Sequence, residues 1–220
     1  MLDRPVILFD LDGTVLDSAP GIVSAQQQAM RDVGLPAADE ALLRSDLGPP
    51  PAVLLARAGV PPHLVDDAVA AYRRHYLDQG IRDAALFPGV SEMLITLRRQ
   101  YRLATATMKL ISTAVPFLQH HGIHDHFEVI GGGQEGAPLD KSAIIEATML
   151  TLGSPPPDQM IMVGDRATDI RGGRDHGLRT IAVSWGYGSR DELEASSPDA
   201  IVDRPSELPA VAARLLGRPA

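Results

Sequence analysis

The sequence predicts an α/β fold, in which a parallel sheet is flanked by helices and interrupted by a helical insertion. Short apolar runs rich in strand-forming residues alternate with helix-patterned segments, which is typical of a parallel sheet with helices on both faces. Between the first and second of these runs, about ninety residues hold no convincing strand. A simple crossover connection needs far fewer, so this stretch predicts a second, smaller domain.

Five runs form the predicted strands of the sheet. The first is continuous and apolar, as expected for a buried strand, and the other four follow the long insertion. They lie at residues 6–9, 103–107, 127–130, 160–163 and 180–184. Helical patterns accompany the later strands, at residues 89–100, 112–121, 141–152 and 170–176.

The insertion is predicted to be wholly α-helical. Proline-rich stretches, which read as turns, separate helical pieces around residues 21–32, 39–46, 51–58 and 63–79. We therefore expect two domains: an α/β core made of residues 1–18 and 86–220, and a helical domain made of residues 19–85.

Composition narrows the possible partners and the cellular location. The chain has 220 residues, 45% of them apolar, a formal net charge of −8 and no cysteine. The negative charge, with no block of basic residues, disfavours a nucleic-acid polymer or an anionic membrane as partner. No apolar run approaches the ~18 residues of a membrane span, and the N-terminus lacks a signal-peptide pattern. These features predict a cytoplasmic protein that could still bind a small anion in a local cationic pocket.

Polar residues end three of the predicted strands. Asp10 and Asp12 follow the first, Thr107 ends the second, and Asp165 follows the fourth. In open α/β sheets, ligands bind beyond the carboxyl ends of the strands, so these side chains should face one crevice. Paired carboxylates are costly to bury without a cation or a chemical role.

Four short segments carry a resemblance to a known family. "DLDGT" resembles the first motif of the haloacid dehalogenase superfamily, Thr107 in "TATMK" the second, Lys141 in "LDKSAII" the third and "GDRATD" the fourth. The motifs occur in the expected order and span nearly the whole chain. The resemblance implies a Rossmann-like core, and the insertion is similar to the helical C1-type cap of the phosphoglycolate phosphatase and 5′-nucleotidase branch.

The resemblance implies a phosphatase that uses Mg²⁺. Asp10 would be the nucleophile that forms an aspartyl phosphate, and Asp12 the general acid and then base. The carboxylates of Asp10 and Asp165 and the backbone carbonyl of Asp12 would hold the metal, with Asp169 orienting ligands from behind. Thr107 and Lys141 would hold the transferring phosphoryl oxygens. The implied substrate is a small phosphomonoester such as phosphoglycolate, a nucleoside monophosphate or a sugar phosphate.

Alternatives remain open at this point. The aspartates could cap helices or turns, Thr107 could be a strand filler, and Lys141 could be a solvated lysine, with Lys109 then the next candidate cation. A sugar phosphomutase of the same superfamily, or a regulatory protein that keeps the fold without hydrolysis, are alternative functions. A dehalogenase or phosphonatase is disfavoured, because such relatives lack an aspartate at the position of Asp12.

Three further signals have a weaker bearing on function. "GGGQEG" at residues 131–136 matches a dinucleotide-binding spacing, but no helix opens at its third glycine. The four histidines of residues 120–127 could bind a transition metal, although solvated positions at a helix end fit them better. In the helical insertion, the loop at residues 46–51 is expected to face the substrate, and Arg57, Arg73 and Arg74 are candidates to read a substrate carboxylate. The oligomeric state cannot be read from the sequence.

Overall fold

The computed structural model describes residues 4–45, 47–137 and 139–217. The chain forms two compact units, Met1–Leu16 with Leu86–Ala220, and Asp17–Ala85. The boundaries fall within two residues of those predicted. The function of the helical unit as a cap stays a prediction.

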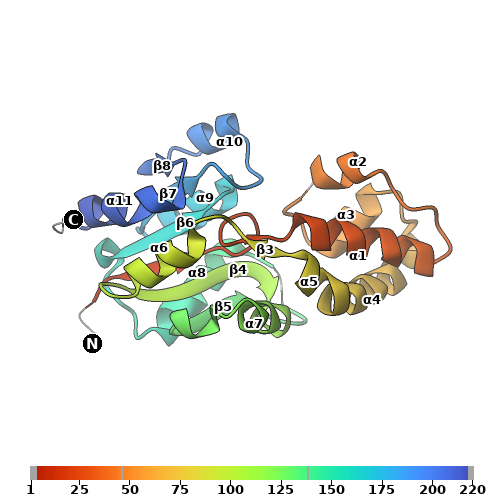
Figure 1. Cartoon of the computed structure of the whole chain (residues 1–220), viewed down its shortest axis with the longest axis horizontal. Helices are drawn as coiled ribbons and strands as arrows, with labels where there is room; N and C mark the ends of the chain where they lie inside the picture. Colours follow the sequence, from red (N-terminus) through yellow and green to blue (C-terminus); the bar gives the residue numbers. More distant parts are fainter. Residues whose placement is uncertain (1–3, 46, 138, 218–220) are drawn as a thin grey trace. The chain divides into compact units, whose positions relative to one another are not determined.

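The first unit contains a six-stranded, all-parallel sheet with the strand order β5-β4-β1-β6-β7-β8 (Figure 1). The strands are β1 (Val6–Phe9), β4 (Arg102–Leu110), β5 (Val129–Gly133), β6 (Met160–Gly164), β7 (Arg179–Val183) and β8 (Ala200–Val202). The chain first runs outward from β1 through β4 to β5, and then returns to the other side of β1 for β6 to β8. The carboxyl end of β1 is therefore the point where the strand order reverses, which is where ligands bind in such sheets.

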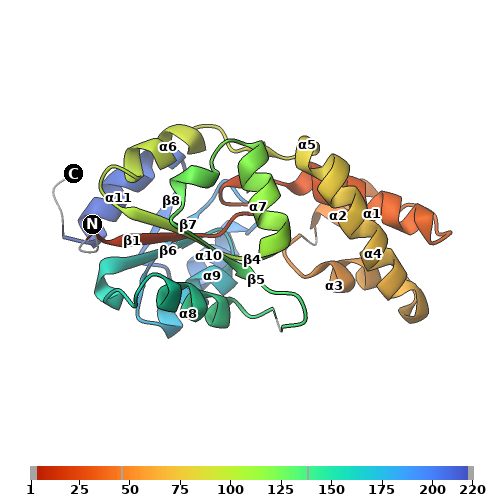
Figure 2. The same ribbon diagram turned by 90° about the horizontal axis from the view of Figure 1, so that it is seen from below.

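Helices cover both faces of this sheet. Figure 2 shows α6 (Val90–Leu97) and α11 (Leu208–Leu215) together on one side of the strands and α8 (Lys141–Thr151) and α9 (Ala167–Asp175) together on the other. Helices α7 (Ile111–His120) and α10 (Arg190–Ala195) complete the layers. The predicted α/β fold is confirmed.

The core explains the apolar run of β1. Val6 and Leu8 point toward α8 and pack with Ile144 and Ile145 of that helix. Phe9 lies on the opposite face of the strand and meets Phe127 edge to face, with ring centroids 6.3 Å apart. Both faces of β1 are thus buried, and alternation of polar and apolar residues would be costly here.

The structure also differs from the predicted elements. Strand β5 (Val129–Gly133) starts and ends later than expected. Its glycines have low strand propensity, but Gly131 packs closely between Thr105 of β4 and Thr148 of α8. Helix α9 begins three residues earlier than predicted, and β8, α10 and α11 have no counterpart among the predicted elements. A separate two-stranded sheet pairs β2 (Leu16–Asp17) with β3 (Ala85–Leu86).

The second unit is helical, as predicted. Helix α1 (Ala19–Asp32) packs along α4 (Val65–His75), with α2 (Glu40–Ser45), α3 (Pro51–Arg57) and α5 (Ile81–Asp83) around them. The segment expected as one helix at residues 63–79 consists of a 3₁₀ turn (Pro62–Leu64), α4 and a π-helical turn (Tyr76–Gly80). In the described part of the chain, no helix is long and apolar enough to cross a membrane.

Candidate active site

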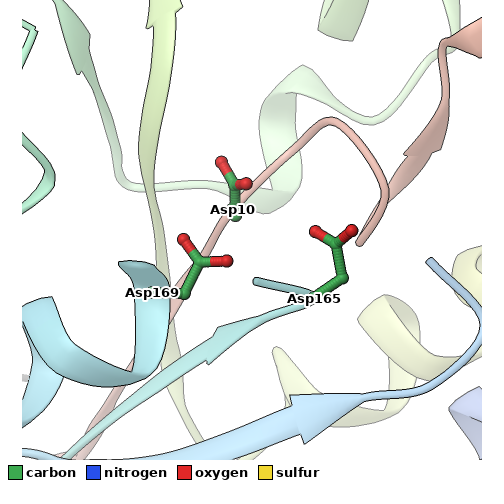
Figure 3. Close-up of side chains that lie close together, drawn as sticks. All are labelled: Asp10, Asp165 and Asp169. Atoms are coloured by element: carbon green, nitrogen blue, oxygen red, sulfur yellow. The ribbon is translucent and has the colours of Figure 1, made fainter. Parts of the chain in front are cut away.

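Three carboxylates from different elements meet at the carboxyl edge of the sheet. Asp10 follows β1, Asp165 follows β6, and Asp169 lies in the first turn of α9. One oxygen of each lies within 4.8 Å of the others, and Figure 3 shows the three side chains lying together. All three residues are buried. The sheet brings them together because β1 and β6 are parallel neighbours in register up to Phe9 and Val163.

Lys141 supplies the positive charge for this cluster. Its Nζ lies 2.7 Å from Asp169 Oδ1 and 3.1 Å from Asp10 Oδ1, and it donates a hydrogen bond to the carbonyl of Ala106 at 2.8 Å. Lys141 is the first residue of α8, and Asp140 caps that helix by accepting a hydrogen bond from the N–H of Ala143 at 2.8 Å. The cap fixes the start of the helix and with it the lysine.

Asp165 is held by donors from two loops. Thr14 Oγ1 donates to its Oδ1 at 3.1 Å, and the backbone N–H of Tyr187 donates to its Oδ2 at 2.8 Å. Gly13 has a φ of +87°, and a Cβ at this position would lie 2.6 Å from the Asp165 carboxyl carbon. Glycine is therefore required in "DLDGT", because the turn needs left-handed backbone and the carboxylate packs directly against it.

Asp169 connects the cluster to the start of α9. Its Oδ2 accepts a hydrogen bond from the N–H of Arg166 at 3.0 Å, while its Oδ1 faces Lys141. The family resemblance implies that Asp169 orients the metal ligands from outside the metal's own ligand set. The structure puts it in the same buried cluster as Asp10 and Asp165.

Burial dominates the electrostatics of the cluster. It raises the pKa of Asp165 to about 8, with further contributions from Asp169 and Asp10. It also raises the pKa of Asp169 to about 6, although Lys141 opposes the shift. For Lys141, burial disfavours the ammonium, but attraction to Asp10 and Asp169 outweighs it and raises the pKa. The site carries more negative than positive charge, which favours a cation.

The donor set fits a hard divalent metal. Three carboxylates at one edge offer only oxygen ligands, and Mg²⁺ prefers oxygen. Asp10 and Asp165 and the backbone carbonyl of Asp12 are the ligands predicted from the sequence. A divalent cation there would relieve the repulsion that raises the pKa of Asp165.

Asp12 and Thr107 lie beside this cluster with different partners. The Asp12 side chain is 27% exposed, and its Oδ1 lies 3.0 Å from Nζ of Lys109. Thr107 is buried, and its Oγ1 accepts a hydrogen bond from the N–H of Lys109 at 3.2 Å. Burial lowers the pKa of Lys109, while Asp12 and Asp10 oppose the shift. Lys109 is thus an additional residue of the site, whereas the sequence suggests it only as a replacement for Lys141.

The weaker sequence signals have structural explanations. Glycines 131–133 belong to β5, and α8 opens only at Lys141, so the glycine-rich segment does not begin a helix. His124 contacts Asp125, and His126 contacts Arg98. Among the described residues, the only group of potential metal ligands is the aspartate cluster.

The substrate contacts expected from the helical unit stay predictions. Asp46, the first residue of the loop expected to face the substrate, lies outside the described residues. Arg57, Arg73 and Arg74 are exposed. Arg74 is engaged within its own unit, with a guanidinium nitrogen 3.3 Å from Asp32 Oδ2.

A family model described as haloacid dehalogenase-like hydrolase matches residues 7–183. The chain belongs to this family. The predicted family is confirmed, and all the site residues named from the sequence fall within the matched range.

Individual relatives carry two kinds of names. The chain is 35% identical to a phosphoglycolate phosphatase of Cupriavidus necator, covering 93% of this chain and 91% of that protein. It is 38% identical to the tyrosine-protein kinase PtkA of Mycobacterium tuberculosis over 87% of this chain, and spans 66% of the length of that relative. Among solved structures, a haloacid dehalogenase-like hydrolase from Streptococcus pneumoniae has a TM-score of 0.87 and 34% identity, covering 96% of this chain and 99% of the other.

Proposed function

We propose that this protein is a Mg²⁺-dependent phosphatase that hydrolyses a small phosphomonoester through an aspartyl phosphate on Asp10. The observation that carries the proposal is the position of Lys141, whose ammonium faces Asp10 and Asp169 at the carboxyl edge of the sheet. A nucleophilic carboxylate with an adjacent buried cation is suited to attack a phosphoryl group that carries negative charge. The phosphatase-named relative at 35% identity supports the same reaction class.

In the first step, a carboxylate oxygen of Asp10 attacks the phosphorus atom and the ester P–O bond breaks. Asp12 gives its proton to the leaving oxygen, so the product alcohol departs neutral. In the second step, Asp12 takes a proton from water as that water attacks the phosphorus of the aspartyl phosphate. Asp10 is restored as a carboxylate and inorganic phosphate leaves.

Other residues position the phosphoryl group. Lys141 would hold its oxygens as a point charge, and Thr107 would contribute from β4, just before the register shift of that strand. Asp10, Asp165 and the backbone carbonyl of Asp12 would hold Mg²⁺, which when bound supplies charge neutralisation at the phosphoryl oxygens. Both oxygens of Asp169 already contact Lys141 or the N–H of Arg166, so we assign it to orienting the lysine.

We further propose that the helical unit, Asp17–Ala85, acts as a cap that selects the substrate. Such caps exclude water and bring side chains to the non-phosphate end of the substrate. The substrates to test first are phosphoglycolate, nucleoside monophosphates and sugar phosphates.

The test is a phosphate-release screen with the full chain and Mg²⁺, and with Asp10→Asn as the control. Release from at least one small phosphomonoester, absent in the control, supports the proposal. No release from any ester overturns it. Transfer of the phosphoryl group to a second sugar hydroxyl would instead indicate a mutase, and transfer from ATP to tyrosine would indicate the activity in the name of the PtkA relatives.

A further inference from the structure

Lysine is rare in this chain, and both lysines lie in the candidate active site. The sequence holds two, Lys109 and Lys141, among its 20 lysines and arginines. Their side chains are only 4% and 5% exposed, and each contacts one aspartate of "DLDGT", Lys109 contacting Asp12 and Lys141 contacting Asp10. Arginine supplies all the other basic charge. A lysine provides a compact point charge, and a planar guanidinium matches its sign but not its shape.

The end of β4 directs Lys109 toward Asp12. The register between β4 and β5 shifts after Thr107, so that Leu110 rather than Met108 pairs with Gly133. Such irregularities redirect side chains at the ends of strands. Gly132 of β5 allows this backbone to approach, because a Cβ there would lie 2.8 Å from the Lys109 carbonyl oxygen.

The next helix along the chain supports the lysine. The Nζ atom of Lys109 lies 4.2 Å from the ring centroid of Phe117 in α7, and Phe117 is fully buried. A cation over an aromatic ring is stabilised, more so when it is desolvated. The end of β4, Gly132 and the ring of Phe117 together fix the Lys109 ammonium 3.0 Å from Asp12 Oδ1.

We infer that Lys109 is a positioning residue that fixes the carboxyl group of Asp12 for proton transfer to the leaving oxygen of the substrate. The inference rests on the proposed function. It predicts that losing Lys109 harms the proton transfer more than it harms phosphoryl binding. An ester whose leaving group needs no proton should therefore be affected least.

The test compares Lys109→Met and Lys109→Arg on two substrates, an alkyl phosphomonoester and p-nitrophenyl phosphate, whose phenolate leaves readily without a proton. The value of kcat/KM reports the steps up to phosphorylation of Asp10. We expect Lys109→Met to lower it about 100-fold or more for the alkyl ester, the scale of general acid catalysis, and less than about tenfold for p-nitrophenyl phosphate. Lys109→Arg should recover at least part of the loss.

A matched control separates this effect from general damage to the fold. Arg102 is the other buried cation of β4, at the amino end of the strand, where it pairs with Glu128. Arg102→Met should change the two substrates equally. If Lys109→Met also lowers both substrates equally, Lys109 acts on the phosphoryl group or on the fold, and the inference is overturned.

A spectroscopic measurement tests the contact without turnover. Protein labelled with ¹³C in lysine alone gives side-chain signals from two residues, which Lys109→Arg assigns. Asp12→Asn should shift the Lys109 signals more than those of Lys141. If the wild type hydrolyses no ester of the screen, the proposed function fails, and this measurement still decides the pairing. If the Lys109 signals do not move in Asp12→Asn, the inference is overturned.

Discussion

Replacing Lys141 with methionine should destabilise the protein by an amount that grows with pH. The change keeps most of the side-chain volume but removes the ammonium that faces Asp10 and Asp169 at 3.1 and 2.7 Å. Breaking a buried ion pair by removing one partner costs about 3–5 kcal/mol. For a chain of this size, each kcal/mol lowers Tm by about 2–4 °C. The expected loss is therefore roughly 6–20 °C at pH 8.

The direction of the pH dependence follows from the carboxylates left behind. Lys141 opposes the effect of burial on the pKa of Asp169, which is about 6 with the lysine present, so the pKa rises further in the variant. A carboxyl group whose pKa is raised by folding contributes stability at low pH, and this contribution is lost as pH rises through the folded-state pKa. The deficit of the variant should be smallest near pH 5 and largest near pH 8.

Thermal unfolding of EDTA-treated protein at pH 5 and pH 8, followed by circular dichroism, measures both effects. Arg102→Met is the matched control, because it removes a buried cation whose partner, Glu128, is half-exposed. Glu128 returns to an ordinary carboxyl pKa in that variant and stays ionised from pH 5 to 8, so its deficit should not depend on pH. We expect neither of two results: a free energy of unfolding for Lys141→Met within about 1 kcal/mol of the wild-type value at pH 8, or a loss of stability that is equal at both pH values. Either result would refute the role of the Lys141 charge.

Three further predictions concern the nucleophile and the metal. Asp10→Asn should reduce turnover to near background, and a folded variant that keeps more than about a tenth of wild-type kcat would contradict the nucleophilic role. Activity should disappear in EDTA and return with Mg²⁺, and Ca²⁺ should inhibit because its larger shell can take both oxygens of Asp10; full activity after exhaustive chelation would exclude the metal. Because the pKa of Asp165 is raised to about 8 without metal, Mg²⁺ must displace a proton from this ligand. Its affinity, measured by calorimetry, should therefore rise from pH 6 to pH 8, and a pH-independent affinity would argue against Asp165 as a ligand.

The carboxyl edge of the sheet could be predicted because its signals are local. Asp10 and Asp165 each come directly after an apolar run, and parallel strands bring the residues at their carboxyl ends to the same edge. The sheet confirms the α/β fold inferred from these runs. The elements that the sequence did not indicate are short, such as the three-residue strand β8. The predicted strand whose bounds shifted, β5, is rich in glycine. Local propensity is weak there and packing decides.

The contact between Lys109 and Asp12 shows where local pattern stops being informative. Its geometry depends on a register shift at the end of β4, on Gly132 in the neighbouring strand and on Phe117 in the next helix. None of these is visible as a spacing around Lys109, because the direction of a side chain beyond a bulge is set by the groups against which the bulge packs. Composition carries a signal that spacing does not. A chain that places lysine at two positions, and buries both against neighbouring aspartates, indicates that their compact charge matters for the site rather than for solubility.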